Sequence, residues 1–111
     1  MSWDLSDRTI RSQKIRLWTQ RLREEYEQIC FLYNLKLRRP VIRIDEMQSR
    51  WGFWDSESRT IALSERLIEN YDWEIVLEIF KHEIAHQIVC ELFKEEEAHG
   101  VLFKKACDRL G

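Results

Sequence analysis

The sequence lacks the features of a membrane, secreted or repetitive protein. It contains no run of about 18 uncharged apolar residues, the length that a membrane-spanning helix requires. Its N-terminus, MSWDLSDRTIRS, has no apolar segment of the kind that a secretory signal carries. With 3 glycines and 1 proline in 111 residues, it also shows no repeat, low-complexity tract or linker. We therefore expect a cytoplasmic protein with no membrane partner, folded as one domain over residues 1–111.

Cysteine is also scarce, which bears on metal and redox chemistry. Cys30, Cys90 and Cys107 are odd in number, and none has the C-x-x-C spacing of a zinc ribbon or a redox pair. We interpret them as reduced, mostly buried small apolar residues. Apolar residues at 44% and charged residues at 34% are ordinary values for a soluble globular protein.

Acidic residues are few in the first part of the chain. Up to Arg43 there are 10 basic and 5 acidic residues, and after it there are 8 basic and 15 acidic residues. The net charge of the whole chain is only −2. A basic segment is more often a solvated helix face with paired charges than a surface for a phosphate backbone. If the chain binds DNA weakly, or associates with the nucleoid, we expect four basic residues to make the contacts: Arg11, Lys14, Arg16 and Arg21. The sequence predicts no oligomeric state.

Apolar periodicity predicts an α+β fold. Apolar residues recur at spacings of three or four over about 6–34, which predicts an N-terminal amphipathic helix with Asn34 as a left-handed stop. The alternation in LKLRRPVIRID predicts extended chain, and two short strands are predicted at Trp51–Trp54 and Thr60–Leu63, joined by DSES. Together these segments predict a small antiparallel sheet of about three strands.

The second half of the chain predicts three helices. Ser64 and Asp72 are expected to cap a short and a long helix through their side-chain oxygens. The long helix, Trp73–Phe93, is apolar around nearly its whole circumference and is therefore expected in the middle of the domain. VLFKKACDRLG resumes helical spacing and predicts a C-terminal helix. The core that carries the motifs is expected to span about 40–111.

The stretch KHEIAHQIVC contains the pattern H-E-x-x-H. His82 and His86 are four residues apart, so on a helix they project from one face and can share a tetrahedral zinc ion. Glu83 lies about 100° around from His82, within reach of a metal-bound water without being a ligand. The alternative is two core histidines bonded to carbonyls, with Glu83 paired to a lysine. Because an ionisable triplet is costly to bury without compensation, we favour the metal site.

The chain offers several third ligands. His99, the remaining histidine, lies 13 residues beyond His86 and directly before the last predicted helix. Three acidic residues are the alternative, although such a run is more often solvated: Glu95, Glu96 and Glu97. A metzincin would have a glycine at the position of Val89 and a third histidine at the position of Leu92, so this chain does not follow the metzincin pattern. Cys90 is too far from His82 to share a metal easily. We predict one Zn²⁺ per chain, with His99 as the favoured third ligand.

Four segments, in this order, resemble the SprT-like zinc metallopeptidase domain, the Spartan family: RWGFWD, RTIALSERLI, LEIFKHEIAHQIV and HGVLFKKACDRLG. The resemblance implies a zincin-like fold, with His82, His86 and His99 as zinc ligands and Glu83 as general base. It also implies zinc-dependent hydrolysis of peptide bonds in protein or peptide substrates, including DNA-associated or DNA-crosslinked proteins. Many relatives carry a zinc ribbon after this core, whereas this chain has no cysteine pairs to build one.

Two further questions stay open at the level of sequence. Arg50, Trp51, Phe53 and Trp54 are first interpreted as strand and core residues. Alternatively the aromatic strand of Trp51, Gly52, Phe53 and Trp54 forms an exposed edge that binds substrate by strand addition. Tyr71 and Arg59 are nearby polar candidates for stabilising an oxyanion. The alternative function is a nucleic-acid-binding or partner-binding module with a structural zinc, which would require a fourth ligand that is not evident.

Overall fold

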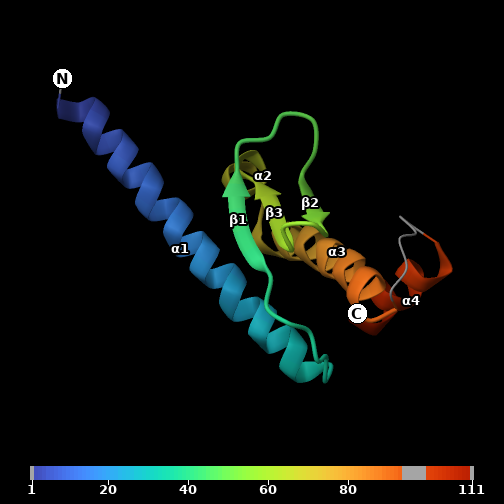
Figure 1. Ribbon diagram of the computed structural model, residues 1–111. Coiled ribbons are helices and arrows are strands. Elements are labelled where there is room, and N and C mark those ends of the chain that lie inside the picture. The colour runs from blue at the N-terminus through green and yellow to red at the C-terminus, as the bar shows by residue number, and fades with distance from the viewer. Residues whose placement is uncertain (1, 94–99, 111) are drawn as a thin grey trace.

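The computed structural model describes residues 2–93 and 100–110 and confirms the predicted α+β class (Figure 1). Its elements are α1 Ser2–Leu32, β1 Val41–Asp45, β2 Gly52–Asp55, β3 Thr60–Ser64, α2 Glu65–Asn70, α3 Trp73–Glu91 and α4 Val101–Leu110. The predicted helices and strands are thus present, with ends shifted by a few residues. No helix in the described part of the chain has the length and apolarity needed to span a membrane.

The sheet is mixed, so the prediction of an antiparallel sheet was wrong for one of its two strand pairs. The strand order is β1-β3-β2, with β2 antiparallel and β1 parallel to β3. The chain reverses direction between β1 and β2 and again in the hairpin between β2 and β3, so β3 runs in the same direction as β1. Because β3 lies in the centre, β1 and β2 are both edge strands.

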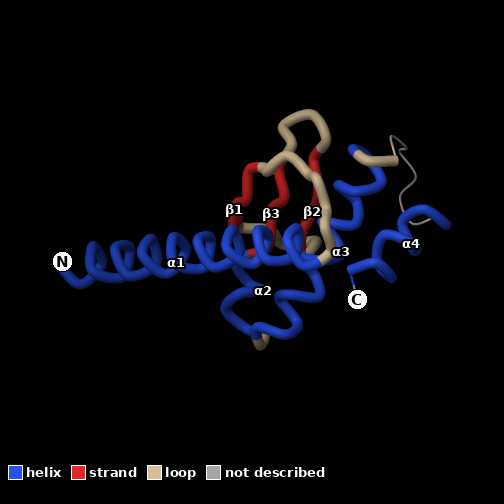
Figure 2. The backbone as a smooth tube through the Cα atoms, turned by 90° about the horizontal axis from the view of Figure 1, so that it is seen from below, coloured by secondary structure: helices blue, strands red, loops and turns tan. Residues whose placement is uncertain are grey.

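The N-terminal helix α1 buries its side chains mainly through its C-terminal part. Leu22, Tyr26 and Ile29 are buried, whereas residues 8–14 are exposed. Figures 1 and 2 show the N-terminal turns of α1 extending well past the sheet. The helix begins earlier than predicted, and Asn34 ends it with φ of 52°, as expected for a left-handed stop.

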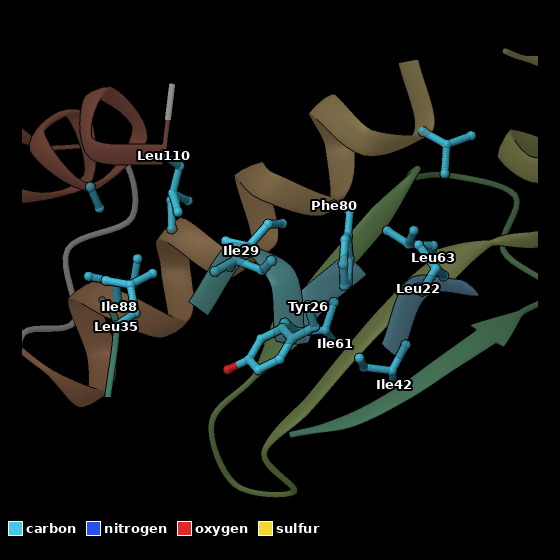
Figure 3. Packing of buried hydrophobic residues seen from close by; sticks show 14 of the residues in the cluster. Leu22, Tyr26, Ile29, Leu35, Ile42, Ile61, Leu63, Phe80, Ile88 and Leu110 are labelled. Atoms are coloured by element: carbon cyan, nitrogen blue, oxygen red, sulfur yellow. The ribbon is translucent and has the colours of Figure 1, made fainter. Parts of the chain in front are cut away.

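The core lies between the sheet and helices α1 and α3. Tyr26 of α1 and Phe80 of α3 have ring centroids 6.4 Å apart, and Figure 3 shows both beside Ile61 of β3 and Ile42 of β1. All five residues of β3 are buried, as befits the central strand. Burial of this cluster is the main stabilising term for the fold, and it holds α3 beneath the sheet.

Helix α3 occupies the central position that its composition predicts. It contacts α4, β2, β3 and α2, and it buries eight residues: Val76, Phe80, Glu83, Ile84, Ala85, Gln87, Ile88 and Val89. The predicted side-chain cap at Ser64 is confirmed, since its Oγ accepts from the Arg66 N–H at 3.2 Å. The predicted side-chain cap at Asp72 was wrong, because only the Asp72 backbone carbonyl accepts hydrogen bonds, from Ile75 and Val76.

The three cysteines are less buried than predicted. Cys30, Cys90 and Cys107 are free thiols of intermediate exposure. Cys30 and Cys107 pack against the edge of the hydrophobic core, and burial raises the pKa of each of these two thiols. They are therefore protonated at neutral pH, which agrees with the expected reduced, apolar role.

Candidate metal centre

His82 and His86 lie side by side on α3, as their spacing predicts. Their ring centroids are 5.0 Å apart and their planes are inclined by 79°. Two imidazoles that bind one tetrahedral zinc through nitrogens at the usual distance would have centroids about 5 Å apart. The separation of the two rings therefore fits two ligands of one zinc ion.

The third ligand cannot be placed from the described residues. His99 and its alternatives Glu95, Glu96 and Glu97 all fall outside residues 2–93 and 100–110. Within those ranges no group of three His, Cys, Asp or Glu side chains is positioned to hold a metal ion. The choice between His99 and a glutamate thus stays a prediction.

Phe103 of α4 packs against both histidine rings, a contact that the sequence did not reveal. Its ring centroid lies 4.8 Å from that of His82 and 4.3 Å from that of His86, and its side chain is buried. The ring orients the two imidazoles and excludes water from one side of them. Helix α4 is therefore part of the structure that holds the histidine pair.

Glu83 is buried beside the two histidines. It is 6% exposed, and burial raises the pKa of its carboxyl to about 7, while the positive charge of Arg50 acts in the opposite direction. In the described part of the chain no lysine or arginine forms an ion pair with it. The alternative in which Glu83 pairs with a lysine is therefore not what the structure shows.

Strand β2 runs across α3 beside Glu83. A Cβ added to Gly52 would lie 3.5 Å from Cγ of Glu83, so β2 faces the Glu83 side chain at Gly52 and leaves room for about one methyl group. Among the strands that the structure describes, β2 pairs only with β3, so its other edge has no strand partner in that part of the chain. Phe53 and Trp54 are half-buried. Trp51 is 38% exposed and Arg50 is exposed before the strand begins, so the interpretation of these two as strand and core residues was wrong.

The two oxyanion candidates have other partners. Arg59, at φ of 50°, donates to both carboxylate oxygens of Glu91 at 2.6 Å and to the carbonyls of Arg38 and Arg39. Tyr71 is 43% exposed and meets the Trp51 ring edge-on at 5.3 Å between centroids. Arg59 is thus a structural residue, while Tyr71 belongs to the surface beside β2.

A buried polar network on the other side of α3 was also missed from the sequence. Gln87, the neighbour of His86, is 0% exposed; its Oε1 accepts from the Tyr26 hydroxyl at 2.9 Å, and its Nε2 donates to Glu91 at 2.8 Å. Gln87 Nε2 also donates to the Arg38 carbonyl. The network connects α1, α3 and the chain before β1, so it fixes the helix that carries the histidines.

Of the four residues predicted to contact nucleic acid, two have partners within the protein and two are exposed without an ion pair in the described part of the chain. Arg11 pairs with Glu65, at 2.5 Å, and with Glu46, so it is a paired charge. The Arg21 guanidinium lies 3.8 Å from the centroid of the Trp73 ring and 5.2 Å from that of Trp18. Lys14 and Arg16 are exposed, and among the described residues neither takes part in an ion pair.

Known structures with a similar fold include two metallopeptidase zymogens. The metallopeptidase zymogen jannalysin of Methanocaldococcus jannaschii superposes with a TM-score of 0.60 at 21% identity, over 80% of this chain and 88% of that chain. The metallopeptidase zymogen abylysin of Pyrococcus abyssi superposes with a TM-score of 0.63 at 18% identity, over 79% of this chain and 77% of that chain. No curated protein sequence matches.

The sequence itself matches a family model over most of its length. The model describes the SprT-like family, and the match covers residues 15–111, which include β1 to β3 and helices α2 to α4. The histidine pair, Glu83 and the β2 edge all fall within this match. The chain therefore belongs to the SprT-like family.

Proposed function

We propose that this protein is a zinc-dependent metallopeptidase that cleaves peptide bonds in protein or peptide substrates. The observation that carries the proposal is the pair His82 and His86, with ring centroids 5.0 Å apart on one face of α3, next to the buried carboxyl of Glu83. Membership of the SprT-like family and the fold shared with two metallopeptidase zymogens support it.

Each residue of the site has a distinct role. His82, His86 and His99 would hold one zinc ion, which supplies Lewis-acid chemistry by polarising a peptide carbonyl and lowering the pKa of water. Glu83 accepts the proton of the attacking water on its carboxylate and returns it to the leaving amine.

The open edge of β2 would position the substrate. An extended peptide can add to this edge through main-chain hydrogen bonds, which would bring its backbone close to Gly52 and Glu83. Such binding depends on the peptide backbone and therefore suits protein substrates of varied sequence. Trp51, Phe53 and Trp54 would then contact the substrate side chains.

The metal assignment is tested by zinc content. Purified protein should contain one zinc per chain, and His99→Ala should lose it, because two imidazoles alone hold zinc weakly. The triple variant Glu95→Gln, Glu96→Gln, Glu97→Gln is the matched control and should keep it. Full zinc content in His99→Ala, with loss in the triple variant, would move the third ligand to a glutamate.

We also propose that DNA-associated or DNA-crosslinked proteins are among the substrates, with weak DNA binding through Lys14 and Arg16. Both side chains are exposed cations on α1. Binding to single-stranded DNA should weaken in the double variant Lys14→Gln, Arg16→Gln and fade steeply with salt. Cleavage of a DNA-binding protein with and without DNA at two salt concentrations measures the effect. Equal cleavage in all four conditions would leave a peptidase that DNA does not stimulate.

A further inference from the structure

Arg50 is a cation beside the candidate site with no carboxylate partner in the described chain. It lies in the loop before β2, is exposed, and takes part in none of the ion pairs found within residues 2–93 and 100–110. Its guanidinium lies 4.9 Å from the centroid of the Phe53 ring. That contact holds the side chain at the surface of β2 and leaves N–H groups available for an anion.

The position of Arg50 is fixed relative to Glu83. Arg50 stands two residues before Gly52, which faces the Glu83 side chain, and its charge is felt at the Glu83 carboxyl. Trp51 lies in a bend and β2 begins at Gly52, so Arg50 is at most about 7 Å of chain from the start of the strand. A peptide added along β2 would therefore pass Arg50 within about two residues of its part next to Gly52.

Two other arginines near β2 or on the sheet have hydrogen-bond or ion-pair partners. Arg66 donates to the carbonyls of Met47 at 3.1 Å and Gln48 at 2.7 Å, and its guanidinium lies 5.1 Å from the centroid of the Trp51 ring. Arg43 pairs with Asp45 at 2.9 Å. Arg50 has no ion-pair partner within residues 2–93 and 100–110, so its guanidinium is open to an anionic group that arrives at the start of β2.

An exposed aromatic pair adjoins Arg50. Trp51 is 38% and Tyr71 43% exposed, and their rings meet edge-on with centroids 5.3 Å apart. Exposed aromatic rings beside a cation provide an apolar surface for one substrate side chain next to a site for a negative charge. The combination is suited to a peptide with an acidic residue close to an apolar one.

We propose that Arg50 is a specificity-determining residue that binds a substrate carboxylate, from an Asp or Glu side chain or a peptide C-terminus, within about two residues of the scissile bond. The Trp51–Tyr71 pair packs against the adjacent substrate residue. This inference rests on the proposed peptidase function. A guanidinium binds a carboxylate through two parallel N–H···O bonds, which gives selectivity over an amide of equal size. Nucleic acid is disfavoured here because its binding draws on several cations rather than one.

Matched peptides test this selectivity in zinc-loaded protein. In each pair one peptide carries Asp and the other Asn at a single position, which is one of the two residues before or the two residues after the cleaved bond. Each peptide is also made in two forms, with a free and with an amidated C-terminus. One Asp position, or the free C-terminus, should raise kcat/KM about fivefold or more over its neutral partner. In Arg50→Gln the ratio of kcat/KM between the acidic and the neutral peptide should fall to about one. Arg43→Gln, which removes an equal charge elsewhere on the sheet, should keep the ratio of the unaltered protein. A ratio near one in the unaltered protein, or an unchanged ratio in Arg50→Gln, would overturn the inference.

A binding measurement separates this inference from the proposed function. Labelled peptides are titrated into zinc-loaded Glu83→Gln and into Glu83→Gln, Arg50→Gln, with fluorescence anisotropy as readout. The single variant should prefer the acidic peptide and the double variant should not. If this preference is found but the unaltered protein cleaves no peptide, the Arg50 site stands and the peptidase proposal fails. If peptides are cleaved but no preference for the acidic peptide is found, the peptidase proposal stands and the Arg50 site fails. Displacement of the peptide by single-stranded DNA that depends on Arg50 would contradict the assignment to a substrate carboxylate.

Discussion

The backbone of Gly52 lies against the side chain of Glu83, so that a methyl group at position 52 would be 3.5 Å from Cγ of Glu83. The same methyl group would be 2.9 Å from the Ala62 carbonyl oxygen and 2.9 Å from Cδ2 of Leu63, which is closer than real Cβ atoms approach. Both close approaches are to β3, whereas 3.5 Å to Glu83 is an ordinary van der Waals contact. Glycine at position 52 therefore lets β2 pair closely with β3 while it faces Glu83 of α3.

Gly52→Ala should destabilise the protein and impair the site. Because the Ala62 oxygen belongs to the backbone of β3, relief of the contact requires β2 to shift, and we expect a loss of about 1–3 kcal/mol in the free energy of unfolding. Urea titration measures it, with Ser56→Ala in the exposed hairpin turn as control. Zinc content should be unchanged while peptide cleavage falls. Unaltered stability and cleavage would show that β2 is not held at this distance.

Trp54→Phe should leave stability unchanged or raise it by up to about 1 kcal/mol. The Trp54 indole N–H is buried and has no hydrogen-bond partner among the described residues, so its removal relieves an unsatisfied donor. The same substitution at the more exposed Trp51 is the control and should have little effect. A clear loss of stability in Trp54→Phe alone would mean that the N–H finds an acceptor in solution.

Glu91→Gln should reduce stability in a pH-dependent way. The hydrogen bonds from Arg59 lower the pKa of the Glu91 carboxyl in the folded state. Its contribution to stability is thus present above the unfolded pKa, about 4.3, and is lost as pH falls through the lower folded pKa. We expect a loss of about 1–2 kcal/mol at pH 7 that shrinks below about pH 4. Glu78→Gln, an exposed substitution on the same helix, should show no such dependence; parallel curves for both variants would refute the prediction.

Removal of zinc should lower the melting temperature without unfolding the chain. The core around Tyr26, Phe80 and Ile61 is buried independently of any metal, whereas a ligand that binds only the native state adds stability. Circular dichroism with and without a chelator measures both quantities. Loss of all helical signal on chelation would instead indicate a structural zinc.

The residues of the candidate site differ in how far the sequence predicts them. The pair His82 and His86 follows from helical spacing alone, because both lie on one regular element. The parallel pairing of β1 with β3 could not be predicted, since short strands show the same apolar alternation in either direction. Arg50 and Phe103 reach the site through tertiary packing, and only the fold brings these distant segments to α3. Gln87 was missed because a polar residue in an apolar helix does not reveal its buried partner, Tyr26.

The most direct test of the metallopeptidase proposal is the activity of Glu83→Gln. Zinc content and melting temperature are measured first and should match those of the unaltered protein, since Glu83 is not a proposed ligand. Cleavage of a peptide substrate should then fall about 100-fold or more, because the amide cannot take the proton from water. Equal rates of cleavage in Glu83→Gln and the unaltered protein, at equal zinc content, would contradict the proposal.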